Sequence, residues 1–151
     1  MAEEQKRTNR GAILTQLIRT VFPLNGCLLE AGDRLSCDVG LSSALWQVLG
    51  AISDNPRSVP QIGRVMGLTR QSVQRSVNVM AEDGLVQFVP NPDHKTSPLV
   101  QLTSHGQTAY AEVMRLQVEW SNRLAQQFKT KDLQVAVQVL QSFVEVLEND
   151  R

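Results

Sequence analysis

The segment Ser58–Thr103 limits the fold most strongly, because caps and glycines divide it into short elements in a fixed order. Ser58 followed three residues later by Gln61 is typical of a capping box, and it predicts a short helix that ends near Gly67. Thr69 then predicts the cap of a second helix after a two-residue connection. Two short helices joined by a tight turn with glycine indicate a helix-turn-helix, a motif that also occurs in proteins that do not bind DNA.

Strand signals follow the second helix. This helix should end at Gly84, and the next residues, LVQFV (85–89), alternate and are rich in β-branched side chains, as strands are. The loop NPDHKTS leads into PLVQLT (98–103), where Pro98 takes the first strand position, at which proline is tolerated. This order of elements predicts a winged helix, so the fold class is mainly α with a small β-hairpin wing.

Helical periodicity continues before this core. Apolar positions predict a helix over about 10–30, although Pro23 lacks an amide and should kink or split it. Gly32-Asp33 and Gly40 mark an expected loop. Ser42 or Ser43 then predicts the cap of a further helix. That helix should bury Leu45, Val48, Leu49 and Ile52.

Two more helices are predicted after the core, one over about 104–128 and a last one capped by Thr130. The last helix has an unusually wide apolar arc, made of Leu133, Ala136, Val137, Leu140, Phe143, Val144 and Leu147. Such a helix at the end of a small domain needs a partner, and pairing with its symmetry mate in a two-fold dimer satisfies this need. Packing on its own domain is the alternative.

The runs LWQVLGAIS and VPQIGRVMGLTRQSVQRSVNVMAEDGLVQFVPNPDHKTSPLVQLTSHG resemble the winged-helix core of the multiple antibiotic resistance regulator (MarR) family of bacterial transcription factors. The closest matches are LTRQSVQRSVNVMAEDGLV, the wing loop NPDHKTS, and LTSHG. The resemblance implies a homodimer held by its first and last helices, a recognition helix from each subunit in the major groove, and wings near the minor groove. It also implies that a small ligand often binds between the two functional parts.

On this basis residues 1–40 and 104–151 are expected to form a helical dimerisation region. Residues 41–103 are expected to form the winged helix-turn-helix DNA-binding region, with the whole chain as one compact unit. The partners expected are double-stranded DNA carrying an inverted repeat, a second copy of the chain, and a small-molecule effector, with no membrane.

The helix that begins after Thr69 has two different sides. Val73, Val77 and Met80 fall on one stripe at helical spacing and should be buried. The outward side carries planar amide and guanidinium groups, which can bond two base-edge atoms at once in the major groove. These base-reading candidates are Gln71, Gln74, Arg75 and Asn78. Hydroxyls, an arginine and helix-start amides at the sides suit phosphate oxygens. These phosphate candidates are Thr69, Arg70 and Ser72.

Charge is neutral overall and basic locally. Fifteen Lys and Arg residues balance fifteen Asp and Glu residues, so the whole chain does not point to nucleic acid or to a membrane surface. Residues 57–95 instead carry five basic side chains against three acidic ones. An ordinary solvated helix face is the alternative interpretation, but the helix has no outward acid before Glu82.

The wing gives weaker evidence. The family's wing tip usually pairs an aspartate with arginines that reach the minor groove. Asp93 matches this aspartate, whereas His94 and Lys95 stand where arginine is common. We expect Asp93 to fix the shape of the wing by local hydrogen bonding, and His94 and Lys95 to contact DNA.

Other function classes find little support. The chain has no HExxH, GxSxG or glycine-rich phosphate loop, and its two histidines lack a nucleophile constellation, so neither an enzyme nor a cofactor is expected. Cys27 and Cys37 do not have metal-ligand spacing, and we expect reduced thiols in a cytoplasmic protein without a metal.

The sequence therefore predicts a sequence-specific DNA-binding transcriptional repressor, binding an inverted repeat as a homodimer and released by a small-molecule effector. Two alternatives stay open. One is a winged-helix protein-interaction module without DNA binding, and the other is a redox-responsive regulator acting through Cys27, a thiol more simply interpreted as buried or inert. The sequence identifies no ligand-binding residues.

Overall fold

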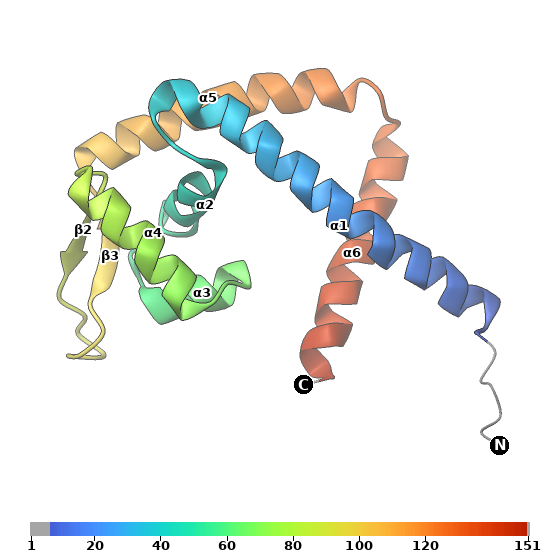
Figure 1. Cartoon of the computed structure of the whole chain (residues 1–151), viewed down its shortest axis with the longest axis horizontal. Helices are drawn as coiled ribbons and strands as arrows, with labels where there is room; N and C mark the ends of the chain where they lie inside the picture. The colour runs from blue at the N-terminus through green and yellow to red at the C-terminus, as the bar shows by residue number, and fades with distance from the viewer. Residues whose placement is uncertain (1–6, 151) are drawn as a thin grey trace. The chain divides into compact units, whose positions relative to one another are not determined.

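The computed structural model describes residues 7–150, so positions 1–6 of the predicted dimerisation region, and residue 151, lie outside the described residues. The chain divides into two compact units, Met1–Val113 and Met114–Arg151. Helix α5 continues from the first unit into the second (Figure 1). The elements in chain order are α1 (Asn9–Ser36), the short 3-10 helix η1 (Cys37–Val39), α2 (Ser43–Ala51), β1 (Arg57–Ser58), α3 (Val59–Met66), α4 (Arg70–Glu82), β2 (Val86–Val89), β3 (Leu99–Leu102), α5 (Ser104–Ala125) and α6 (Thr130–Asn149).

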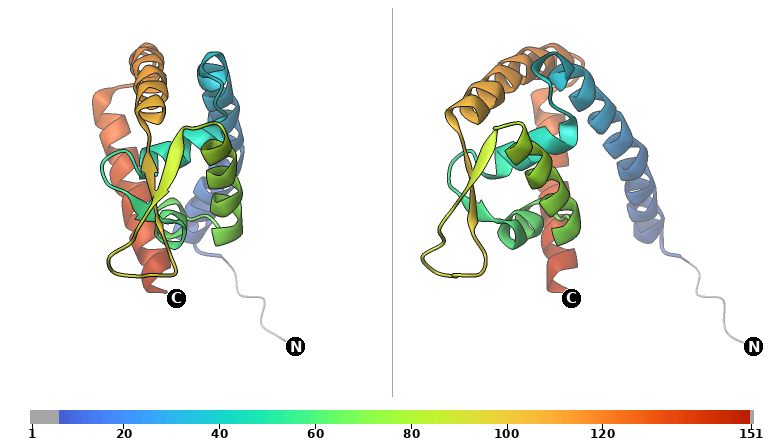
Figure 2. Two further views of the ribbon diagram at one scale, coloured as in Figure 1. Left: turned by 90° about the vertical axis from the view of Figure 1, so that its left-hand side faces the viewer. Right: turned by 60° about the vertical axis from the view of Figure 1, so that its left-hand side comes forward.

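The strands form one small antiparallel sheet in the order β1-β3-β2. β2 and β3 are the predicted hairpin, with Val86 opposite Leu102 and Val89 opposite Leu99. Figure 2 shows the long loop that joins them. β1 was not predicted; it adds a third strand by pairing Arg57 with Val100. The predicted fold class, mainly α with a winged helix-turn-helix, is confirmed.

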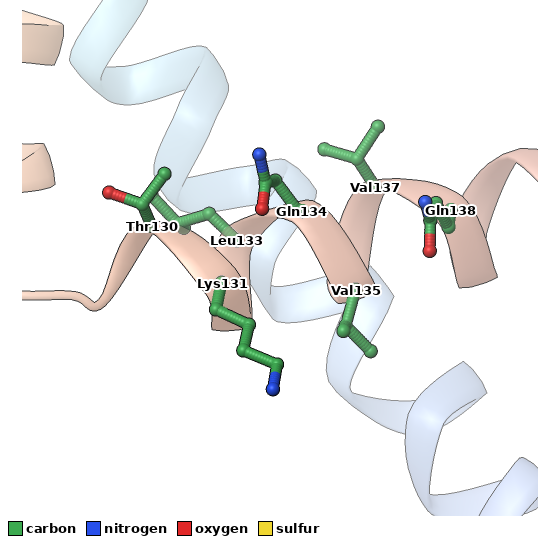
Figure 3. Close-up of a pocket in the computed structure, with 7 residues that line it drawn as sticks. All are labelled: Thr130, Lys131, Leu133, Gln134, Val135, Val137 and Gln138. Carbon is green, nitrogen blue, oxygen red and sulfur yellow. The ribbon is translucent and has the colours of Figure 1, made fainter.

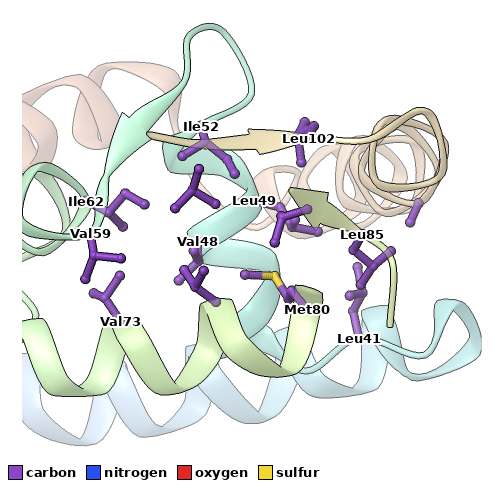
Figure 4. Close-up of a cluster of buried hydrophobic side chains, with 14 of the residues drawn as sticks. Leu41, Val48, Leu49, Ile52, Val59, Ile62, Val73, Met80, Leu85 and Leu102 are labelled. Atoms are coloured by element: carbon purple, nitrogen blue, oxygen red, sulfur yellow. The ribbon is translucent and has the colours of Figure 1, made fainter. Parts of the chain in front are cut away.

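The apolar core lies where α2, α3 and α4 meet the sheet (Figure 4). Val73, Val77 and Met80 on α4 have no exposed surface, as their spacing predicted. On α2 the predicted burial holds for Val48, Leu49 and Ile52, while Leu45 is half-buried. The core therefore fixes which side of α4 faces outward.

The predicted caps of the helix-turn-helix are present. The Ser58 backbone N–H donates to Gln61 Oε1 at 2.8 Å. This is the capping-box bond in which the side chain at the third helical position reaches back to the backbone of the cap residue. Thr69 Oγ1 accepts from the Ser72 backbone N–H at 3.1 Å. Gly67 ends α3 with φ 63°, a left-handed conformation that suits glycine. Local sequence signals thus set the bounds of α3 and the start of α4.

Helix α1 differs from its prediction. It continues through Pro23 without a break and runs past Gly32 to Ser36, so the expected split and the expected loop at Gly32 are both wrong. Gly32 instead lies against α2, since a Cβ added there would be 2.6 Å from the Ser43 Cβ. Asp33 reinforces this crossing, because its Oδ1 accepts from the Ser43 backbone N–H at 2.7 Å.

The end of α4 is tied to the start of α5 by what we call the Thr103 clasp. Thr103 Oγ1 donates to the Gly84 carbonyl oxygen at 2.6 Å and lies 3.2 Å from that of Leu85. The same hydroxyl accepts from the Gly106 backbone N–H at 3.0 Å. Any Cβ on Gly106 would overlap the Leu85 carbonyl oxygen, so the close approach requires glycine.

Large apolar side chains stay exposed on α1 and α6. Phe22 on α1 is 72% exposed and Val146 on α6 is 63% exposed. By length and composition alone, the segment 9–39 could cross a membrane, because it contains an 18-residue window with a mean hydropathy of 1.4. One such helix does not establish a membrane span, because core helices of soluble proteins and N-terminal signal sequences pass the same test. Figure 3 shows exposed α6 side chains, including Leu133, Val135 and Val137.

Candidate nucleic-acid interface

The outward side of α4 gathers the side chains that the sequence nominated for base contacts. They surround one shallow surface hollow, together with one of the phosphate candidates. The residues lining it are Arg70, Gln71, Gln74, Arg75 and Asn78. All of these belong to the helix whose opposite side is sealed in the core, so they cannot turn inward without unfolding the domain. The result is a polar surface with two guanidinium groups and three carboxamides.

Two of these side chains are joined. Gln74 Nε2 donates to Asn78 Oδ1 at 2.9 Å, across one turn of the helix. Gln74 is half-buried and Asn78 is exposed. Sequence spacing placed both residues on the polar side. Their separation by four residues is the signal that could have predicted the bond, although the sequence interpretation did not use it.

The helix start carries the phosphate candidates. The Thr69 hydroxyl accepts from the Ser72 backbone N–H, so Thr69 fixes where the helix begins. Thr69, Arg70 and Ser72 are all exposed. First-turn backbone N–H groups and an arginine beside them form a surface that suits anions.

The wing loop takes its shape from Asn91 rather than from Asp93, the residue that the sequence suggested. Asn91 Oδ1 accepts from the Asp93 backbone N–H at 3.1 Å, and Asn91 Nδ2 donates to the Ser97 carbonyl oxygen at 2.8 Å. An asparagine in the first position of the loop can make both bonds because its amide donates and accepts. His94 and Lys95 are exposed in this loop, and His94 Nδ1 lies 3.2 Å from the Thr96 hydroxyl.

A polar cleft lies between the helix-turn-helix and the wing loop, with a volume of about 530 Å³. Its lining includes Arg64 from α3, Arg70 from α4 and His94 from the wing. Arg64 was not among the site residues predicted from sequence. In the sequence, Arg64 counted only as one of the five basic residues of 57–95. Its place in the cleft could not be predicted, because the cleft depends on the position of a loop that is distant in sequence. Lys95 does not line the cleft.

The two cysteines are free and exposed. Cys37 Sγ lies 3.3 Å from the Arg34 carbonyl oxygen, and Cys27 is on the exposed part of α1. The interpretation of Cys27 as a buried thiol is therefore wrong for the single chain. Within residues 7–150, no three His, Cys, Asp or Glu side chains form a group that could hold a metal ion.

Known proteins resemble this chain in sequence and in fold. Residues 39–95 match the profile of the MarR family. An uncharacterized protein of Mycobacterium tuberculosis is 35% identical over 138 residues, covering 91% of this chain and 96% of that protein. The crystal structure of a mutant MarR from E. coli complexed with operator DNA superposes with a TM-score of 0.77, at 17% identity, over 86% of this chain and 94% of that one. The chain belongs to the MarR family.

A further relative of this MarR-family chain has a named role. The transcriptional activatory protein BadR of Rhodopseudomonas palustris is 29% identical over 115 residues, covering 70% of this chain and 66% of that protein. The predicted membership of the MarR family of winged-helix transcription regulators is confirmed, and BadR is named as a transcriptional activatory protein.

Proposed function

We propose that this MarR-family regulator acts in the cytoplasm as a homodimer that binds an inverted repeat in duplex DNA, with α4 of each subunit in the major groove. One observation carries this proposal. The inner side of α4 is sealed in the core, while its outer side presents arginines and carboxamides together. These are the groups whose donor and acceptor geometry matches base edges.

In this proposal different residues on the polar side of α4 contact bases and phosphates. Base edges are read by Gln71, Gln74, Arg75 and Asn78, and phosphates are held by Thr69, Arg70 and Ser72. His94 and Lys95 reach the minor groove from the wing. Arg64 joins the phosphate contacts, because it lines the cleft that separates α3 from the wing loop.

The dimer is proposed from the uncovered apolar sides of the terminal helices. Phe22 and Ile13 on α1 and most of the apolar side of α6 are exposed in the single chain, and water contact with so much apolar surface is unfavourable. We therefore assign residues 1–40 and 104–151 to dimerisation and 41–103 to DNA binding. A two-fold axis would place the two copies of α4 about one DNA turn, roughly 34 Å, apart.

We propose repression as the direction of control, because a dimer on an operator competes with other proteins for the same DNA. BadR carries the name of an activator, so a promoter-reporter assay with and without the protein must decide between the two. Release by a small-molecule effector is proposed on the family resemblance alone.

Salt dependence tests the proposal against a protein-interaction module. Fluorescence anisotropy would measure binding to a duplex from upstream of the protein's own gene and to a scrambled duplex of the same composition. The logarithm of affinity should fall with the logarithm of salt by about 0.9 for each phosphate neutralised. Equal affinity for both duplexes, or binding to neither, would exclude the proposed function.

The redox alternative acting through Cys27 has its own test, since this thiol is exposed. Hydrogen peroxide should leave DNA binding by the wild type and by Cys27→Ser equally strong if control does not depend on this cysteine. Release of the wild type alone would favour the redox alternative.

A further inference from the structure

The bond between Gln74 and Asn78 creates a combined hydrogen-bonding surface on α4. A carboxamide nitrogen carries two hydrogens and a carboxamide oxygen carries two lone pairs. After Gln74 Nε2 donates one hydrogen to Asn78 Oδ1, the nitrogen retains a donor and the oxygen retains an acceptor. These two atoms are 2.9 Å apart on side chains that line the same surface hollow, so a donor stands beside an acceptor.

The order of donor and acceptor matters for base recognition. In the major groove adenine presents the N7 acceptor beside the N6 donor, whereas guanine presents two acceptors. A donor and acceptor that bond the N7 edge of one purine therefore complement adenine and leave one mismatched contact with guanine. A G·C pair offers an acceptor beside a donor only across its two bases, at guanine O6 and cytosine N4. We propose that Gln74 and Asn78 act as one unit, the reading pair, that bonds N7 and N6 of one adenine and so selects an A·T base pair; this inference rests on the proposed function.

The bond also favours joint reading energetically, and a neighbouring arginine adds a second kind of base reader. The bond holds both side chains before DNA arrives, so less rotamer freedom is lost on binding than for two separate amides. Arg75 lines the same hollow but has only donors, which suits the two acceptors of guanine. The polar side of α4 thus carries an adenine-type reader beside a guanine-type reader.

Selection from a random duplex library tests the reading pair without requiring a defined operator. Wild type, Gln74→Ala, Asn78→Ala and the double variant would each be selected and sequenced. We expect both single variants to relax the same A·T position, by about 5- to 150-fold in discrimination, the range for one bidentate base contact. The double variant should discriminate no worse than either single variant, because each single change already removes the unit.

A matched control and a modified base complete the test. Gln107→Ala changes an exposed glutamine in the first turn of α5 and should leave the selected sequence unchanged. Replacing the selected adenine by 7-deazaadenine removes the N7 acceptor, and this should weaken the wild type but not the double variant. Circular dichroism would verify that all variants are folded.

The outcomes separate this inference from the proposed function. Single variants that relax different base pairs, with additive effects in the double variant, would overturn the reading pair while DNA binding stands. A shared position that prefers G·C would also overturn it. A wild type that enriches no sequence would overturn the proposed function and the reading pair together.

Discussion

The Thr103 clasp yields a stability prediction that depends on a single hydroxyl group. Thr103→Val keeps the size and branching of the side chain but removes the hydroxyl. This hydroxyl donates to the Gly84 carbonyl oxygen at 2.6 Å and accepts from the Gly106 backbone N–H at 3.0 Å. Loss of a helix cap costs about 0.5–2 kcal/mol, and a partly buried group left without its partner costs about 1–3 kcal/mol. The two effects overlap because they share bonds. We expect the free energy of unfolding to fall by about 2 kcal/mol.

Thr108→Val is the matched control, because it makes the same change near the start of α5, the helix that Thr103 precedes and caps. The Thr108 hydroxyl donates to the Ser104 carbonyl oxygen at 3.1 Å in an exposed position, so its loss should change stability by less than about 0.5 kcal/mol. Urea unfolding followed by far-ultraviolet circular dichroism would measure both, at equal protomer concentration because dimerisation adds to apparent stability. If the two variants unfolded within about 0.5 kcal/mol of each other, the role assigned to Thr103 would be wrong.

Three further predictions address other contacts. Gly106→Ala should destabilise the chain by at least about 1–3 kcal/mol in urea unfolding, because the new Cβ overlaps the Leu85 carbonyl oxygen; wild-type stability would contradict this close approach. Asp33→Ala should lower the free energy of unfolding by roughly 1 kcal/mol, since it removes the 2.7 Å bond to the Ser43 N–H, and an unchanged urea midpoint would argue against this tie between α1 and α2. Arg75→Ala should cost about 1–3 kcal/mol of specific DNA binding with an unchanged dichroism spectrum, and equal binding would remove its role as a base reader.

The helix-turn-helix could be predicted because its signals are local. Ser58, Gly67 and Thr69 each act within a few residues of themselves, through caps and a left-handed turn. The buried stripe of α4 follows from helical spacing alone, so the opposite polar side could be predicted as well. Local chemistry was sufficient for this part of the fold.

Elements that depend on distant partners could not be predicted. β1 contains two residues, too few for any alternation, and it exists because Arg57 and Ser58 pair with β3. Gly32 resembles a loop residue in sequence, yet its missing side chain serves the close crossing of α1 and α2. The sequence cannot distinguish a glycine required by a turn from one required by packing.

The fine structure of the site was also beyond sequence patterns. Asn91 and Asp93 are both usual loop-forming residues, and only the geometry of the loop selects Asn91 as the one that bridges it. Arg64 enters the cleft because the wing loop lies beside α3. Likewise, spacing by four residues allows the bond between Gln74 and Asn78, but side-chain rotamers decide which of their atoms bond.

Methylation interference at guanine N7 tests the central claim most directly, because this atom lies in the major groove. The experiment would use the duplex that the wild type selects, with Arg75→Ala as the comparison. We expect interference in two clusters about 10 base pairs apart, one for each copy of α4, and weaker interference with the variant. Binding that is insensitive to N7 methylation throughout a guanine-containing footprint would contradict the placement of α4 in the major groove.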